Sequence, residues 1–219
     1  GSGNISLLSA KFLAEGALYK GSWMISGRRT YFDKFFSMYY NYIDETEPGN
    51  YYFWDRHIKL KTSLNQNNQL IYSQFSGKDD LFLSIGGKDF PGIDFGWDWG
   101  NSTQNISWRY IPNSNYIIMT RLSKTAYDFD VDFGVNFNSS TSNNSDSIYN
   151  CESEIILNAA STDLSFYIDN LVEDIDLNQT IKYVHNDEIF LYGGWQIKNL
   201  NLDYREILGD DTVVHITSK

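Results

Sequence analysis

The chain has 219 residues, a formal net charge of −11 and a single cysteine, Cys151. The negative charge argues against a nucleic-acid partner, because binding to phosphates needs a basic surface. One cysteine excludes an internal disulfide framework and a zinc site built from several cysteines. Aromatic residues make up 16% of the chain and prolines number only 3, a composition that suits β-strands.

No apolar run approaches the ~18 residues that a membrane-spanning helix needs. A membrane β-barrel remains open, because only every second residue of its strands faces lipid. In chain order, the predicted strands form four pairs: Asn4 to Tyr19 with Gly21 to Asp33, His57 to Leu64 with Leu70 to Ser76, Asn101 to Ile111 with Tyr116 to Phe137, and Ile175 to Tyr183 with Glu188 to Tyr204.

The segment from Tyr127 to Phe137 has the clearest strand pattern. Its odd positions are aromatic or β-branched, and its even positions carry aspartate, glycine or asparagine. This period of two places the two kinds of residue on opposite faces. In a soluble sheet the aromatic face would be core. In a barrel it would face lipid, with the aspartates in the lumen or above the membrane.

Short and long connections alternate between the strands. The tight polar turns are Asn65 to Asn68, Pro112 to Asn115 and His185 to Asp187, and long loops are predicted near residues 34–49, 77–92 and 138–147. Outer-membrane barrels have short periplasmic turns and long extracellular loops. We therefore predict an all-β fold over residues 1–219, an antiparallel up-and-down transmembrane β-barrel of about eight strands that is part of a larger barrel.

Three groups of segments carry a resemblance to a known family. The first group is Ile5 to Gly16 with Ser26 to Asp33. The second is Tyr51 to Asp55 with Lys59-Leu60, followed by Ile71 to Ser73 and Gly77 to Asp80. The third is Trp97 to Asn101 with Ile106 to Trp108. Their order and spacing resemble the N-terminal part of the barrel in TonB-dependent outer-membrane receptors of the Bacteroidetes-type branch. That family carries a plug and a TonB box, which this sequence lacks, and a barrel of ~22 strands. The chain therefore looks like a piece of such a barrel, or a shortened relative.

The resemblance implies a place in the bacterial outer membrane and a role in nutrient import. The substrate would be a siderophore, a vitamin such as B12 or an oligosaccharide. The implied partners are membrane lipid, a plug domain and a TonB-type energy-transducing protein, and the chain would supply barrel wall and extracellular loops.

No catalytic pattern is present, so we expect neither an enzyme nor a cofactor. The three histidines are scattered and form no HxxxH or HExxH pair. Asp128, Asp130 and Asp132 superficially resemble a calcium loop, but Phe133 and Ser139 occupy the positions where such a loop needs glycine and glutamate. Strand alternation explains their spacing without a metal.

Aromatic residues in the predicted long connections are the best candidates for ligand binding. The candidate set, which combines ring and carboxylate side chains, is Tyr39, Tyr40, Tyr42, Trp97, Asp98 and Trp99. Such rings can stack on sugars, but they can also form an interfacial belt or pack loops together.

Arg28 and Arg29 are adjacent on a predicted strand, so they point to opposite faces. One of them must lie above the hydrocarbon band or pair with a carboxylate, since a lipid-facing arginine at the membrane midplane costs ~2–4 kcal/mol. The structural interpretation is an interface position. The functional interpretation is contact with a plug or an anionic ligand in the lumen.

Two other functions stay open. A soluble β-sandwich that binds carbohydrate would bury the same aromatic faces and expose a tryptophan, tyrosine and aspartate surface to glycans. A structural subunit of an outer-membrane assembly would explain an incomplete barrel.

Overall fold

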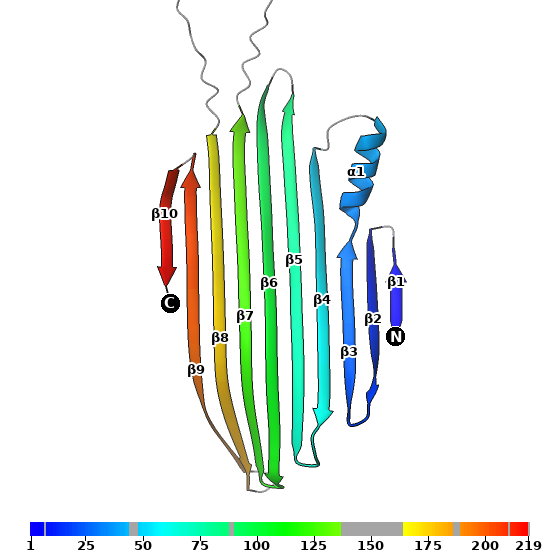
Figure 1. The fold of residues 1–219 in the computed structure, drawn as a ribbon, viewed down its shortest axis with the longest axis vertical. Coiled ribbons are helices and arrows are strands. Elements are labelled where there is room, and N and C mark those ends of the chain that lie inside the picture. The colour runs from blue at the N-terminus through cyan, green and yellow to red at the C-terminus, as the bar shows by residue number, and fades with distance from the viewer. Residues whose placement is uncertain are drawn as a thin grey trace, which may run out of the picture.

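The computed structural model describes residues 1–6, 8–43, 48–87, 90–136, 164–185, 189–209 and 211–218. These residues form one helix and a single sheet of ten strands (Figure 1). The elements are β1 (Ser2–Ile5), β2 (Ser9–Leu18), β3 (Gly21–Thr30), α1 (Phe32–Ile43), β4 (Gly49–Ser63), β5 (Asn68–Gly87), β6 (Phe90–Asn113), β7 (Tyr116–Asn136), β8 (Leu164–Val184), β9 (Phe190–Leu208) and β10 (Asp211–Ser218).

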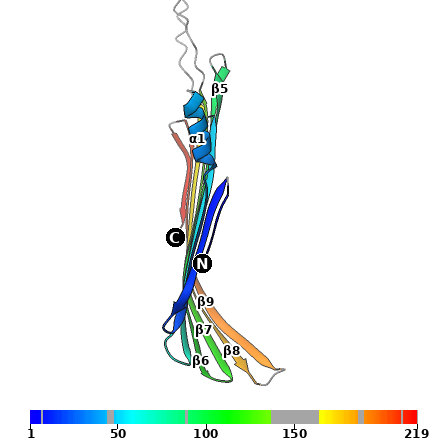
Figure 2. The ribbon, with the colours of Figure 1, turned by 90° about the vertical axis from the view of Figure 1, so that its right-hand side faces the viewer.

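The strands follow one another across the sheet in chain order, and each pairs antiparallel with the next. The predicted all-β, up-and-down architecture is confirmed at this level. The sheet is open, with β1 and β10 at its two edges, and it has ten described strands rather than about eight. Figure 2 shows it almost edge-on, as a single layer that bends away at the end of β6 to β9.

Short turns lie together at one end of the sheet (Figure 1). In the β4–β5 turn the Asn65 side chain accepts hydrogen bonds from the Asn67 backbone (2.9 Å) and the Asn68 amide (2.9 Å). In the β6–β7 turn Asn113 accepts one from the Asn115 backbone (3.0 Å). Asparagine favours tight turns for this reason, and these two predicted turns are confirmed.

The predicted long loops at the opposite end need correction. Residues 34–49 contain most of α1, because aromatic residues four apart contact along it: Phe32 with Phe36 (4.5 Å between ring centroids) and Phe36 with Tyr40 (6.0 Å). Residues 77–87 and 90–92 are strand, because their apolar positions alternate and pair across β5 and β6. The segment 138–147 lies outside the described residues.

The sheet has no apolar interior. Among the described residues no hydrophobic side chain is buried, and the buried residues are Asp33, Ser76 and Ser107 with two glycines, Gly49 and Gly100. No described helix is long and apolar enough to cross a membrane. The stability of the sheet therefore depends on what covers its exposed apolar side chains, since each is worth about 1.5–3 kcal/mol when fully buried.

The strand register defines two faces, which we name by β7. Face 1 carries the even-numbered residues of β7 from Tyr116 to Gly134, together with their cross-strand partners on the other strands. Face 2 carries the odd-numbered residues of β7 and their partners. We call the part near the short turns the turn half (Tyr116 to Lys124 in β7). The part beyond Ala126 is the loop half.

In the turn half face 1 is mostly apolar, up to the row that holds Gln74, Gln104 and Lys124. One row of cross-strand partners runs from β3 to β9 without a charged or amide side chain: Trp23, Leu60, Tyr72, Ile106, Leu122, Leu177 and Ile197. The adjacent row on face 2 is almost wholly polar: Glu15, Met24, Lys59, Ser73, Asn105, Ser123, Asp176 and Lys198.

In the loop half the polarity is reversed. A face 1 row reads Tyr52, Asp80, Asp98, Asp130, Asp169, Arg205 and His215. The neighbouring face 2 row reads Phe53, Asp79, Trp99, Phe129, Asn170, Tyr204 and Ile216. The aromatic face of residues 127–135 is therefore opposite to the apolar face of the turn half, so the two cannot both face lipid.

Candidate functional site

The candidate site is an aromatic patch on face 2 of the loop half, centred on β6. Trp97 and Trp99 are two residues apart on one strand, so they share a face. Their rings meet edge to face, with centroids 5.1 Å apart and planes at 85°, and Trp97 also contacts Phe129 of β7 (6.4 Å). Both tryptophans are more than one third exposed, so ring surface remains open to a ligand.

Asp79 of β5 orients the rings on either side of it. One carboxylate oxygen accepts a hydrogen bond from the Tyr51 hydroxyl of β4 (3.0 Å), and the other accepts one from the Trp99 indole Nε1 (2.5 Å). Burial raises the pKa of Tyr51, and the bond to Asp79 raises it further. Each carboxylate oxygen keeps a second lone pair, so Asp79 can also accept a bond from a ligand hydroxyl.

Two hollows adjoin these residues. A cavity of about 160 Å³ is lined by Tyr51, Asp79, Asp80, Leu81, Trp97 and Trp99. A neighbouring hollow of about 230 Å³ shares Tyr51, Asp79 and Trp99 with it and extends to Arg28, Phe53 and Asp55. Each is smaller than the ~300–1,000 Å³ of a drug-sized pocket. This surface therefore suits successive ring-sized parts of a ligand.

Arg28 lines the hollow of about 230 Å³ and forms an ion pair there with Asp55. Its Nη2 lies 2.6 Å from the Asp55 carboxylate, and the guanidinium carbon lies 4.6 Å from the centre of the Phe53 ring. Arg28 is on face 2 and Arg29 on face 1, as strand alternation requires. With its charge matched by Asp55, Arg28 leaves this end of the patch without a net positive charge.

Arg29 fastens helix α1 to the sheet. It donates to the buried Asp33 carboxylate (2.8 Å), which Lys34 also approaches (3.6 Å), and it lies over the Tyr52 ring (5.0 Å). Asp33 is in the first turn of α1, where a carboxylate is favoured by the helix dipole. Both arginines therefore pair with a carboxylate, Arg28 with Asp55 and Arg29 with Asp33.

The structure brings together only part of the predicted ligand set. Asp98 is on face 1, away from the neighbouring tryptophans, and pairs with Lys78 (2.8 Å). Tyr39, Tyr40 and Tyr42 lie on α1, which packs beside β4, and Tyr39 contacts Tyr40 (5.3 Å). Trp97 and Trp99 form the patch without them.

Tyr51 and Asp79 are the site residues that sequence reasoning missed. The prediction of a loop at residues 77–92 assigns no strand face to Asp79. The alternation of Asp79, Leu81, Leu83 and Ile85 was the available signal.

Four aspartates face one another on face 1 behind the patch. Asp80, Asp98, Asp130 and Asp169 occupy one row on four adjacent strands. Like charges directly opposite one another destabilise a sheet. Lys78 pairs with Asp98 (2.8 Å) and Arg205 with Asp169 (2.6 Å), while Tyr52 donates to Asp80 (3.4 Å).

Asp130 is held by a tyrosine instead of a cation. The Tyr167 hydroxyl donates to its carboxylate (3.2 Å). Burial and the nearby Asp98 charge raise the pKa of Asp130. Burial and the charges of Asp130 and Asp169 raise the pKa of Tyr167 to about 12. Within the described ranges, no three histidine, cysteine or acidic side chains come together as a metal site.

Comparison of the chain with models of known families, with curated proteins and with solved structures gives no match.

We predict that Asp130→Asn lowers the pKa of Tyr167, because the substitution removes the facing negative charge while burial persists and the asparagine carbonyl oxygen can still accept the hydrogen bond from the hydroxyl. Tyrosine ring-carbon NMR during a pH titration measures the change. In the folded wild type Tyr167 keeps its hydroxyl proton up to a pH of about 12, whereas in the unfolded chain it loses the proton near pH 10. The raised pKa of Tyr167 therefore stabilises the folded state below pH 10, and this stabilisation is lost between pH 10 and about 12. Asp55→Asn on face 2 is the control, and equal titrations in Asp130→Asn and wild type would contradict the account.

Proposed function

We propose that the chain is barrel wall of an outer-membrane transport protein, of the kind found in TonB-dependent receptors. The observation that carries the proposal is the apolar row on face 1 of the turn half, which crosses β3 to β9 with a polar row behind it. Outer-membrane strands present this pattern, with side chains that alternate between lipid and lumen.

The height of the apolar band is close to that of a membrane barrel. In β7 the band runs from Tyr116 to Lys124, which is roughly 27 Å along a strand. Strands tilted by ~35–45° lower that to about 19–22 Å, somewhat less than the ~25 Å of the outward apolar band in such barrels. Strands β5 to β9 have 19 to 24 residues, about twice what crossing requires. Their loop halves would then project beyond the membrane.

Aromatic side chains gather on face 1 beside the short turns, as in an interfacial girdle. Tyr116 contacts Tyr183 (4.9 Å between centroids), and Trp108 stacks on Tyr110 (5.7 Å, 12° between planes). Trp195 is also on face 1, because it pairs with Gln179 in the cross-strand row that contains Trp108. Tyrosine and tryptophan suit the boundary between lipid and water because their rings are apolar and one end is polar.

Polar atoms within the apolar band bond to each other. The Trp195 indole donates to the Gln179 side chain (3.2 Å), whose amide donates to Thr120 (3.1 Å). The Trp108 indole donates to Asn68 (3.0 Å). Lipid offers no partners for such groups, so each must find one within the protein.

Face 2 of the turn half has the character of a hydrated lumen wall. Lys198 pairs with Asp174 (2.6 Å), and Gln196 donates to Asp176 (2.7 Å). If face 1 meets lipid, face 2 of the loop half lines the space above the membrane. The Trp97 and Trp99 patch then faces incoming ligand, and the acidic face 1 row faces water.

Among a siderophore, a vitamin and an oligosaccharide, the patch favours the oligosaccharide. Its open rings suit the apolar faces of sugars, and Asp79 can accept bonds from hydroxyl groups. Arg28 is neutralised by Asp55, so the patch offers no free cation to an anionic ligand. A plug domain and a TonB-type energy-transducing protein remain the proposed partners. A carbohydrate-binding sandwich is less well supported, because the described strands form one sheet.

We predict that Leu122→Lys lowers the free energy of unfolding from lipid vesicles by ~2–4 kcal/mol, because it places a charge in the lipid-facing band. The matched control is Ser123→Lys, which places the same charge on face 2 and is expected to change that free energy by less than ~0.5 kcal/mol. Denaturant titrations in vesicles, with heat-modifiable gel mobility as the test of folding, measure both. Equal costs for the two variants would contradict the assignment of face 1 to lipid.

We predict that Trp99→Ala weakens oligosaccharide binding about tenfold or more, since truncation of a tryptophan at a binding surface commonly costs ~2 kcal/mol or more. Titration calorimetry with malto- and xylo-oligosaccharides measures the affinity. Trp108→Ala, on face 1 near the turns, is the matched control and is expected to bind as the wild type does. Equal affinity in both variants would exclude the patch as the ligand site.

A further inference from the structure

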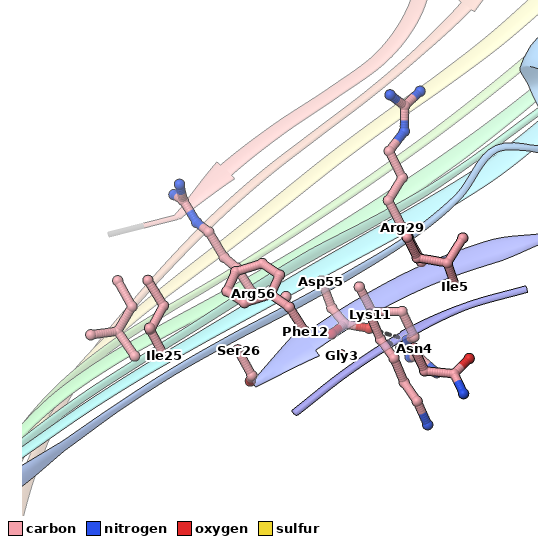
Figure 3. A pocket seen from close by; sticks show the side chains of 14 residues that line it. Gly3, Asn4, Ile5, Lys11, Phe12, Ile25, Ser26, Arg29, Asp55 and Arg56 are labelled. Atoms are coloured by element: carbon pink, nitrogen blue, oxygen red, sulfur yellow. Dashed lines mark hydrogen bonds and ion pairs between the residues drawn. The ribbon is translucent and has the colours of Figure 1, made fainter. Parts of the chain in front are cut away.

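Another hollow lies over the N-terminal strands, and it shares Arg28 and Asp55 with the hollow beside the tryptophan patch. It is an open groove of about 910 Å³ over β1 to β4, shown in Figure 3. Its apolar floor on face 1 is built from Ile5, Phe12, Ile25 and Ile58, and its charged rim from Arg29 and Arg56. Figure 3 shows both arginines extending to one side of the sheet, while Lys11 and Asn4 extend to the other.

A glycine makes room for an aromatic ring in the floor of the groove. Gly27 lies between Phe12 and Arg56 in one cross-strand row. A Cβ atom at this position would come 2.6 Å from the Phe12 ring. The Phe12 side chain can therefore lie over Gly27 and expose a flat apolar surface next to the Arg56 guanidinium.

The groove crosses the upper boundary of the proposed lipid-facing band. Ile25 and Ile58 are in register with Lys124, the last β7 residue of the turn half. Arg56 lies one face 1 row further from the turns, in register with Ala126, and Arg29 one row beyond Arg56. Ile25 and Ile58 thus continue the proposed lipid-facing band, and the arginines are at headgroup height, with Phe12 in the row of Arg56.

This corner of face 1 has an excess of positive charge. Arg29 and Lys34 share one carboxylate, Asp33. Among the described residues, no ion pair involves Arg56, whose guanidinium lies 5.8 Å from the centre of the Trp54 ring. Arg29, Lys34 and Arg56 therefore bring three cations to this corner, and Asp33 is the carboxylate that the first two share, on a chain whose net charge is −11.

We propose that this groove binds one phosphorylated lipid of the surrounding leaflet. The phosphate would lie between Arg56 and Arg29, and an acyl chain along Phe12, Ile25 and Ile58. Arginine presents a planar fork that matches phosphate oxygens, and basic pockets at membrane-embedded surfaces hold anionic headgroups. The apolar floor distinguishes a lipid from free phosphate. The inference rests on the proposed membrane function, because the acyl chain needs a face that meets lipid.

The test is retention of dioleoyl phosphatidic acid by the full chain, measured by native mass spectrometry after extraction from phosphatidylcholine vesicles that contain this lipid. We expect Arg56→Gln to lower the retained fraction about tenfold, the loss of one charge-assisted contact. Arg121→Gln, on face 2 of the turn half, is the matched control and should retain lipid as the wild type does. Dioleoylglycerol, which has the same chains without phosphate, should not be retained, and excess inorganic phosphate should not displace phosphatidic acid.

Equal retention by Arg56→Gln and Arg121→Gln, with unchanged heat-modifiable mobility, would overturn the lipid site and leave the membrane function intact. Displacement by inorganic phosphate would also overturn it, in favour of a plain anion site. Failure of the wild type to enter vesicles would overturn both proposals. If Arg56→Gln does not fold, the Arg56→Lys variant is the deciding test, because lysine keeps the positive charge but lacks the planar fork of the guanidinium. We expect Arg56→Lys to retain a fraction of phosphatidic acid between that of the wild type and background. Retention equal to that of the wild type would contradict a role for the guanidinium fork.

Discussion

The alternation of side chains along unbroken strands is the constraint on which the rest of this structure depends. The register of β7 against β8 runs from Tyr116 to Val135 without a bulge, so every second residue stays on one face. The apolar pattern nevertheless changes from even to odd positions near Ala126 and Tyr127. One rigid sheet therefore presents its apolar surface on face 1 near the turns and on face 2 beyond them, and no described element of the chain buries either surface.

Two environments satisfy this arrangement. In the membrane arrangement that we propose, lipid around the turn half would cover face 1 without any further protein, while the polar rows of face 2 would line water. The outer face beyond the membrane would then be wet, and water would screen the part of the aspartate repulsion that Lys78, Arg205 and Tyr167 do not offset. The aromatic patch would face inward, where Asp79 holds Tyr51 and Trp99 in place.

The sequence predicts the strands better than their positions relative to one another. Period-two alternation identifies Tyr116 to Phe137, and asparagine-rich turns identify Asn65 to Asn68, because both signals are local. The sequence does not predict the helix Phe32–Ile43, because its aromatic residues also suit a loop. Only the register shows that Trp99 meets Asp79 and that Asp98 turns away to Lys78, because pairing between strands depends on residues distant in the sequence.

The exchange of apolar faces is tested most directly by spin labels at Leu122, Ser123, Phe129 and Asp130, each introduced as the single cysteine in a Cys151→Ser chain reconstituted in vesicles. Collision rates with oxygen, which concentrates in lipid, and with a water-soluble nickel chelate report the surroundings of each label. The account predicts that oxygen dominates at Leu122 alone and that the nickel chelate dominates at Ser123 and Asp130. Oxygen dominance at Asp130, or equal exposure of Leu122 and Ser123 to the chelate, would contradict it.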